Sequence, residues 1–226
     1  SLLRSSAGSM GIEPLIRAVV FDWDGTLLDS YRAGTHAYQK MFAAFGKSCD
    51  EARLKRIYSP NWHIVYKKMG IAKKDWPRAD RLWRQHYRSH SPELVPAARG
   101  VLQTLQLRGY RLGLITSGNR SRVLRELKRF RLDKSFEVKL FCEQGGRNKP
   151  DPAVLHLALR RLRAAPAECA YVGDAPEDIE MARRAGVLSI AVFGPYPTHA
   201  RLRRARAKYL LQDLSEILPI LEKNKG

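Results

Sequence analysis

Five short apolar runs, each ending in a polar residue or a glycine, most constrain what this chain can fold into. They cover residues 18–21, 112–115, 170–172, 187–193 and 209–211, and helical patterns follow them. Short apolar strands that alternate with amphipathic helices are typical of a parallel sheet covered by helices on both faces. Ligands of such sheets bind outside the carboxyl ends of the strands. The sequence therefore predicts an α/β fold with a Rossmann-like parallel sheet and a functional site at that edge.

The segment from residue 30 to residue 95 departs from this alternation, because it has helical periodicity only. Residues recur in it at three- and four-residue spacing: Tyr31, Thr35, Tyr38, Phe42 and Phe45. We therefore expect an all-helical cap domain over 30–95, inserted into an α/β core over 12–29 and 96–226. Residues 1–11 are expected to be a tail, and they lack the apolar region of a secretory signal.

Composition narrows the class of protein further. Of the 226 residues, 44% are hydrophobic, which is enough for a buried core. No run approaches the roughly 18 consecutive apolar residues of a membrane span, so an integral membrane protein is excluded. The three cysteines are far apart, at positions 49, 142 and 169. They argue against a disulfide framework and fit a reducing compartment, so a cytoplasmic location is expected.

The net charge of +19 is the unusual feature of the composition, and residues 199–208 form its densest basic run. A strongly basic chain fits the electrostatic footprint of a nucleic-acid binder. The charges are nevertheless spread over helical stretches, and no nucleic-acid-binding motif accompanies them. Solvated helical faces are the simpler interpretation. A nucleic-acid partner is therefore not expected, although the charge keeps that alternative open.

Two pairs of carboxylates follow two of the predicted strands. Asp22 and Asp24 come directly after the first strand, and Asp174 and Asp178 follow the third. Carboxylates at the end of a buried strand are costly unless they are paired or bind a metal. The spacing of Asp174 and Asp178 lets both face the same way if a helix starts there. Two such clusters at one sheet edge suit Mg²⁺, a hard cation that takes oxygen ligands.

Four motifs occur in order along the chain, and together they carry a family resemblance. They are DWDGT at 22–26, LITSGN at 114–119, NKPDP at 148–152 and GDAPED at 173–178. With them the chain resembles the haloacid dehalogenase-like hydrolases, in the subgroup that has a helical cap between the first two motifs. That subgroup includes phosphoglycolate phosphatases and β-phosphoglucomutases. Each motif alone is weak, but four in order are specific, and the resemblance covers nearly the whole chain after residue 17.

The resemblance implies roles for four catalytic residues. Asp22 would be the nucleophile that attacks phosphorus and forms an aspartyl-phosphate intermediate. Asp24 would protonate the leaving oxygen and then deprotonate the attacking water. Lys149 would bridge the phosphate and the nucleophile, and the Thr116 hydroxyl would bind a phosphoryl oxygen. Dehalogenase relatives lack an acid at the position of Asp24, so its presence favours oxygen leaving groups.

A metal and a phosphate cradle are also implied by the resemblance. Mg²⁺ would be held by Asp22, the backbone carbonyl of Asp24 and Asp174, with Asp178 behind them. A phosphate dianion beside Asp22 and Asp174 totals about −4, so the positive charge of Mg²⁺ and Lys149 is needed for binding. Backbone N–H groups would hold the remaining phosphoryl oxygens, near Trp23, Asp24, Ser117 and Gly118.

The cap is where the leaving group would be recognised in such relatives. The polar and aromatic break at 58–63 is the best candidate, and we expect Asn61, Trp62 and His63 to contact the leaving group. Packing of Trp62 between cap helices is the competing interpretation. The cap carries 14 Lys and Arg against 5 Asp and Glu, which would steer anionic substrates toward the site.

These observations favour a Mg²⁺-dependent phosphatase that acts on a small, anionic, phosphorylated metabolite. A sugar-phosphate mutase resembling β-phosphoglucomutase is the main alternative, because it uses the same aspartate pair but returns the phosphoryl group to the sugar. A phosphatase of nucleic-acid ends, or a nucleic-acid-binding module on the same fold, is a further alternative that rests on the charge alone. The sequence leaves the oligomeric state open.

Overall fold

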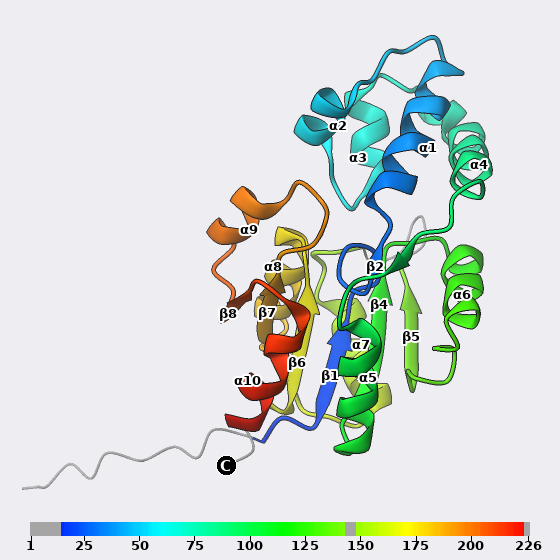
Figure 1. The fold of residues 1–226 in the computed structure, drawn as a ribbon. Helices are drawn as coiled ribbons and strands as arrows, with labels where there is room; N and C mark the ends of the chain where they lie inside the picture. Colours follow the sequence, from blue (N-terminus) through cyan, green and yellow to red (C-terminus); the bar gives the residue numbers. More distant parts are fainter. Residues whose placement is uncertain (1–14, 143–147, 224–226) are drawn as a thin grey trace, which may run out of the picture.

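The structure, a computed structural model, describes residues 15–142 and 148–223, so the tail expected over 1–11 lies outside the described residues. Its centre is a six-stranded sheet in the order β5-β4-β1-β6-β7-β8, in which every neighbouring pair is parallel (Figure 1). The strands are β1 (Ala18–Phe21), β4 (Arg111–Thr116), β5 (Val138–Phe141), β6 (Cys169–Gly173), β7 (Leu188–Val192) and β8 (Tyr209–Leu211). The predicted Rossmann-like α/β fold is confirmed.

Helices cover both faces of this sheet because alternate residues of a strand point to opposite sides. Val19 and Phe21 of β1 pack into a cluster with residues of α5 (Ala98–Leu107), α6 (Arg120–Arg129) and α10 (Ile217–Lys223). Ala18 and Val20 pack on the other face against α7 (Ala153–Leu162) and α8 (Pro176–Arg184). Both faces of the sheet are therefore buried, which explains why the strands are continuous apolar runs in the sequence.

The segment after β1 forms a separate helical layer above the carboxyl end of the sheet (Figure 1). Its helices are α1 (Tyr31–Ala43), α2 (Glu51–Ile57), α3 (Trp62–Lys68) and α4 (Trp76–Tyr87), with the short 3-10 helix η1 (Lys73–Asp75) before α4. Met41 and Phe42 pack against Val65, Tyr66 and Ala79 in an apolar cluster that is separate from the clusters of the sheet. We call this helical layer the cap.

Two short strands join the cap to the sheet. In β2 (Leu28–Asp29) and β3 (Glu93–Leu94), Leu28 pairs with Leu94 and Asp29 with Glu93 in antiparallel register. The chain thus enters and leaves the cap at the same place, directly beyond the loop that follows β1. The two connections between the cap and the sheet therefore lie side by side next to that loop.

The remaining elements lie at the periphery. They are α9 (His199–Arg204) and the 3-10 helices η2 (Pro166–Glu168) and η3 (Leu214–Glu216). Edge strand β5 was not among the predicted strands, because it alternates buried and half-buried residues and carries a lysine at its centre. None of the described helices combines the length and the apolar character that crossing a membrane requires.

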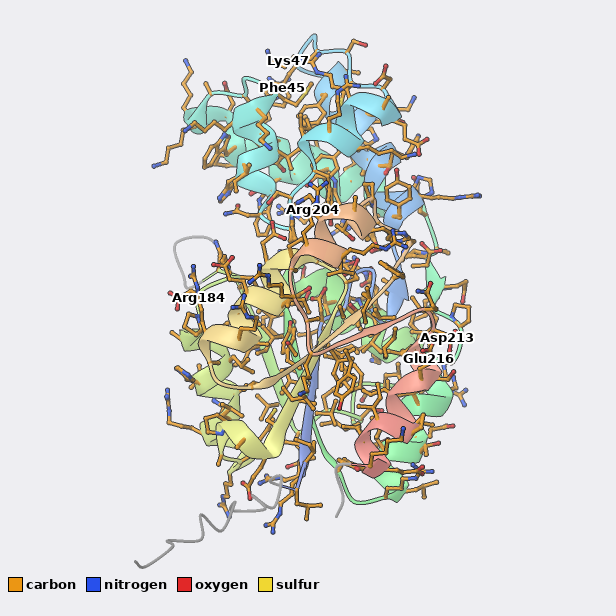
Figure 2. The ribbon with its side chains drawn as sticks, turned by 90° about the vertical axis from the view of Figure 1, so that its left-hand side faces the viewer. Phe45, Lys47, Arg184, Arg204, Asp213 and Glu216 are labelled. Carbon is orange, nitrogen blue, oxygen red and sulfur yellow. The ribbon has the colours of Figure 1, made fainter. Side chains whose placement is uncertain are left out.

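The basic residues are distributed over the outside of the molecule, where Arg184 and Arg204 project from α8 and α9 (Figure 2). Several are paired locally: Arg184 forms an ion pair with Glu180 of its own helix. In the basic run 199–208, Arg201 donates to Glu177 at 2.9 Å, and Arg203 lies over the ring of Phe193 at 4.8 Å. Dispersed and partly paired charges fit solvated helical surfaces, so the absence of a nucleic-acid partner stays a prediction.

Candidate active site

The carboxyl ends of three adjacent strands place the candidate catalytic groups side by side. Because β1 lies between β4 and β6, Phe21 is in register with Leu114 and Val172. Asp22 therefore follows β1 between Thr116, the last residue of β4, and Asp174, which follows β6. All three line one cavity. The strand order thus explains why Asp22 and Asp174, 152 positions apart in the sequence, share one site.

Lys149 lies at the centre of the charged groups. Its Nζ donates to Asp22 Oδ1 at 2.6 Å and lies 2.8 Å from Asp178 Oδ1. Asp178 also accepts from the Tyr171 hydroxyl at 3.0 Å and from the Ala175 backbone N–H at 3.1 Å. Both oxygens of Asp178 therefore have protein donors, which suits a residue that fixes Lys149 rather than one that reacts.

Asp22, Asp174 and Asp178 form a buried group whose ligand atoms lie within 4.8 Å of one another. Asp174 Oδ1 accepts from the Thr26 hydroxyl at 3.3 Å, but the buried Oδ2 has no hydrogen-bond partner among the described residues. A buried carboxylate oxygen without a partner, beside other carboxylates, destabilises the fold unless a cation binds it. These oxygen donors therefore fit a hard divalent cation such as Mg²⁺.

A glycine keeps the space beside this oxygen open. Gly25 has a φ of +88°, and a Cβ atom at this position would lie 2.2 Å from Asp174 Oδ2. The turn after β1 thus requires a residue without a side chain for two reasons, the left-handed backbone and the approach to Asp174. The glycine of the DWDGT motif is explained by the geometry of the site.

Burial and mutual repulsion perturb the carboxylates strongly. Burial raises the pKa of Asp22 to about 7, although the Lys149 charge opposes this, and the Asp178 charge raises the pKa further. Burial, followed by the charges of Asp22 and Asp178, holds the pKa of Asp174 well above its usual range. Burial alone would lower the pKa of Lys149, but Asp178 and Asp22 outweigh it and raise that pKa. Three buried carboxylates around the single charge of Lys149 leave an excess of negative charge, which a divalent cation would offset.

Asp24 is held by a residue that the sequence did not single out. Arg122 of α6 donates to Asp24 Oδ1 at 3.0 Å and to Oδ2 at 2.5 Å. The same guanidinium donates to both oxygens of Glu126, one turn along α6, and to the Tyr87 hydroxyl of the cap at 3.2 Å. Arg122 is only 4% exposed. A cap-to-core network thus surrounds the candidate acid, and the four-residue spacing of Arg122 and Glu126 was its only sequence signal.

The residues expected to form a phosphate cradle lie around the end of β4. Thr116 is fully buried, and its hydroxyl accepts from the Gly118 backbone N–H at 2.9 Å. Thr116, Ser117 and Gly118 all line the cavity. Trp23 differs from them, since its side chain is fully buried and donates from Nε1 to Glu126 at 2.8 Å. Only the backbone N–H of Trp23 would therefore be available to a phosphate, which is the group expected from the sequence.

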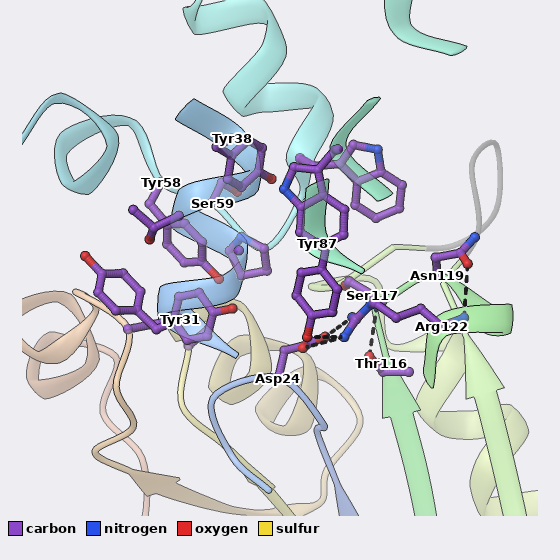
Figure 3. Close-up of a pocket in the computed structure, with 18 of the residues that line it drawn as sticks. Asp24, Tyr31, Tyr38, Tyr58, Ser59, Tyr87, Thr116, Ser117, Asn119 and Arg122 are labelled. Carbon is purple, nitrogen blue, oxygen red and sulfur yellow. Dashed lines mark hydrogen bonds and ion pairs between the residues drawn. The ribbon is translucent and has the colours of Figure 1, made fainter. Parts of the chain in front are cut away.

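The cavity between cap and sheet has a volume of about 460 Å³. Figure 3 shows Tyr38, Tyr58 and Tyr87 gathered above Asp24. The aromatic residues that line it are Tyr31, Tyr38, Tyr58, Trp62, Tyr66, Trp83, Tyr87 and Tyr196. All except Tyr196 come from the cap, so the cap covers the catalytic groups with an aromatic wall.

The three cap residues expected at the leaving group have different surroundings. Trp62, the first residue of α3, lines the cavity together with Tyr58 from the loop before this helix. Asn61 instead caps α3, where its side chain accepts from the His63 backbone N–H at 3.2 Å. The His63 ring stacks on Trp76 with the ring centres 4.3 Å apart. Asn61 and His63 are not among the cavity-lining residues, because an N-cap and a ring stack already fix their side chains within the cap.

Residues 19–192 match the sequence model of the haloacid dehalogenase-like hydrolases. The chain belongs to this family. The match spans all four motifs of the sequence, the cap and the sheet except its edge strand β8. The matched range includes Asp22, Thr116, Lys149 and Asp174.

Individual relatives of this family cover almost the whole chain. The pyrophosphatase PpaX of Bacillus mycoides is 29% identical over 215 residues, which are 93% of this chain and 99% of that protein. The solved structure of a predicted phosphoglycolate phosphatase from Haemophilus somnus has a TM-score of 0.80 at 20% identity, covering 91% of this chain and 97% of that one. A candidate β-phosphoglucomutase from Thermotoga maritima has a TM-score of 0.71 at 27% identity, covering 92% and 99%.

Proposed function

We propose that this chain is a Mg²⁺-dependent phosphatase that hydrolyses a small phosphorylated metabolite through an aspartyl-phosphate intermediate. As a haloacid dehalogenase-like hydrolase it is a phosphoric ester hydrolase. The observation that carries the proposal is the position of Asp22, which contacts Lys149 at 2.6 Å, belongs to the carboxylate group with Asp174, and lines the cavity with Asp24.

The first step transfers the phosphoryl group to the protein. A carboxylate oxygen of Asp22 bonds to phosphorus while the bond from phosphorus to the leaving oxygen breaks. Asp24 gives that oxygen its proton, so a neutral alcohol departs. Lys149 offsets the negative charge on the transferred oxygens, and the Thr116 hydroxyl and backbone N–H groups beside it bind the others.

The second step returns Asp22 to its starting state. Asp24, now a carboxylate, takes a proton from water, and the water oxygen attacks phosphorus as the bond to Asp22 breaks. The products are inorganic phosphate and the free Asp22 carboxylate, so atoms and charges balance. Arg122 donates to both oxygens of the Asp24 carboxylate and holds it from one side.

Asp22, Asp174 and the backbone carbonyl of Asp24 would hold the Mg²⁺, with Asp178 acting through Lys149. When bound, the cation neutralises the charge that two aspartates and a phosphate dianion bring together. The orphaned oxygen of Asp174 and the raised pKa values of Asp22 and Asp174 support its presence.

A sugar-phosphate mutase is the second candidate, favoured by the structural similarity to the candidate β-phosphoglucomutase. The two reactions share the first step and differ in the acceptor of the phosphoryl group. A mutase would need a sugar bisphosphate for turnover and would release little inorganic phosphate. Measuring phosphate release against isomerised sugar phosphate therefore separates the two candidates.

The test is Mg²⁺-dependent phosphate release from a generic phosphate monoester by the wild-type chain and the Asp22→Asn variant. We expect release only with Mg²⁺ and its loss in Asp22→Asn, with thermal unfolding showing that the variant is folded. Asp29→Asn is the matched control, because Asp29 lies in β2 outside the cavity lining. Equal release by Asp22→Asn and wild type would contradict the proposal.

A further inference from the structure

The aromatic wall of the cavity has contributions from both the cap and the sheet. Tyr58, in the loop before α3, stacks on Tyr196, which follows β7, with ring centres 4.9 Å apart and planes 26° apart. Tyr31 of α1 makes an edge-to-face contact with Tyr196, with ring centres 5.4 Å apart and planes 77° apart. Arg201 of α9 donates to the backbone carbonyl of Tyr58 at 3.5 Å and so ties this loop to the sheet domain. Contacts between cap and sheet domain therefore hold the rings of this wall in fixed positions.

A second pair of stacked rings lines the same cavity from α4. Trp83 and Tyr87 lie with ring centres 4.8 Å apart and planes 23° apart. The Tyr87 hydroxyl accepts from Arg122, which places this pair next to the candidate acid Asp24. Trp83 Nε1 is buried without a hydrogen-bond partner among the described residues. A donor left in this state beside a cavity is satisfied when a ligand offers an acceptor.

Among the residues that the structure describes, few of those lining the cavity are cations, despite the charge of the chain. Arg84 is the only Lys or Arg of the cap, residues 30–95, that lines the cavity. Arg122 and Lys149 also line it, but Asp24, Glu126, Asp22 and Asp178 already engage them. Asp80 adds a carboxylate to the cap side. A second anionic group on the leaving side would thus meet rings and carboxylates more than cations.

We infer that the leaving group is a neutral aromatic alcohol, so that the substrate class is a phosphate monoester with an aromatic ring near the ester oxygen. This inference rests on the proposed phosphatase function and specifies its substrate. The volume of about 460 Å³ accommodates such a group, whereas a leaving group of a few atoms would leave most of the wall uncovered. Stacked and edge-to-face ring contacts then supply the binding.

The test compares esters whose leaving oxygens are chemically alike. 2-Phenylethyl phosphate, 2-cyclohexylethyl phosphate and ethyl phosphate are all esters of primary alcohols, so differences in kcat/KM report the fit of the leaving group. We expect 2-phenylethyl phosphate to exceed ethyl phosphate by roughly tenfold or more, from burial of a phenyl-sized group. It should also exceed the cyclohexyl ester, because only the phenyl ring makes ring contacts.

Two variants test whether a preference for the phenylethyl ester comes from the aromatic wall. Tyr58→Ala should reduce the ratio of kcat/KM between the phenylethyl and ethyl esters by about fivefold or more. Tyr209→Ala is the matched control, since Tyr209 lies in β8 away from the cavity, and it should keep the wild-type ratio. Equal loss of the ratio in both variants would overturn the assignment of the wall.

The outcomes separate this inference from the proposed function. If ethyl phosphate, phosphoglycolate or pyrophosphate is hydrolysed as well as 2-phenylethyl phosphate, the aromatic class is overturned while the phosphatase function stands. Equal rates for the phenyl and cyclohexyl esters would also overturn it. If no ester is hydrolysed with Mg²⁺, the proposed function fails, and calorimetry on Asp22→Asn decides the inference. Binding of 2-phenylethyl phosphate tighter than ethyl phosphate by roughly tenfold supports it, and equal binding overturns it.

Discussion

Arg122 and Asp24, 98 positions apart in the sequence, form a two-pronged ion pair in which the guanidinium donates to both carboxylate oxygens. The pair is buried on the arginine side, whereas the Asp24 side chain keeps 21% of its surface exposed toward the cavity. Asp24 also accepts from the Ser30 hydroxyl at 2.6 Å, at the entry to the cap. The group proposed to move protons is thus fixed by the sheet domain and by the base of the cap together.

Replacing Arg122 should impair catalysis more than substrate binding. In Arg122→Gln the side chain of Asp24 loses its fixed orientation, and we expect kcat to fall by about tenfold to a hundredfold with a smaller change in KM. Glu126 is left buried without its cation, so the free energy of unfolding should fall by about 3–5 kcal/mol. Steady-state kinetics and urea unfolding measure the two effects.

Arg125 provides the control for Arg122, because it lies on the same helix but is exposed. Arg125→Gln should leave kcat and stability near the wild-type values. Restoring the ion balance with a second substitution, Glu126→Gln in the Arg122→Gln chain, should recover stability but not kcat. Recovery of kcat as well would show that Arg122 serves stability only.

The metal-free protein should lose stability as the pH rises, and Mg²⁺ should restore it. The folded-state pKa of Asp22, about 7, lies above its ordinary value of 3.8, so the native protein retains a proton that the unfolded chain releases. This contribution is complete below about pH 4 and is lost as the pH rises through about 7. Urea unfolding with EDTA should therefore give a lower free energy at about pH 8 than at about pH 6, and Mg²⁺ should stabilise more at the higher pH.

Asp174→Asn should remove much of this behaviour, because it deletes one of the repelling carboxylates. The metal-free variant should be more stable than the metal-free wild type at about pH 8, and Mg²⁺ should no longer stabilise it. Asp133→Asn changes an exposed carboxylate and should behave as wild type in both respects. A wild-type response to Mg²⁺ in Asp174→Asn would exclude Asp174 as a ligand.

Gly25 and Gly46 allow backbone strain to be separated from crowding of the site. Both have a positive φ, but a Cβ at Gly46 meets nothing within 4 Å, whereas one at Gly25 meets Asp174 Oδ2 at 2.2 Å. Gly46→Ala should therefore cost only the left-handed backbone, about 1–2 kcal/mol, and keep full activity. Gly25→Ala should lower the free energy of unfolding by more than Gly46→Ala does, and it should abolish Mg²⁺-dependent phosphate release. Similar activity in the two variants would show that the space beside Asp174 is not needed.

The sequence was informative wherever the chemistry depends on residues close together in a motif. The carboxylates after β1 and β6 and the apolar runs before them could be placed at one sheet edge, because parallel strands end at a common edge. Trp83 and Tyr87 could be assigned to a helix, but periodicity could not show that their rings also line a cavity. A residue on an amphipathic helix of the cap has the same pattern whether it faces the cap interior or the substrate.

Other features depend on contacts between distant segments and left no readable signal. Arg122 and Glu126 look like an ordinary pair on a helix surface, since nothing in the spacing shows that α6 packs against Trp23 and Asp24. Edge strand β5 was missed because only one of its faces is buried.

The most direct test of the account is whether Asp22 becomes phosphorylated, and the Asp24→Asn variant makes this visible. With p-nitrophenyl phosphate, whose phenolate leaves without a proton, the first step proceeds without Asp24, whereas the second lacks its base. We predict a burst of one p-nitrophenolate per chain with Mg²⁺, and a chain carrying one phosphoryl group that hydroxylamine removes, mapping to Asp22. Linear p-nitrophenolate release without a burst, and with no phosphorylated chain, would contradict the account.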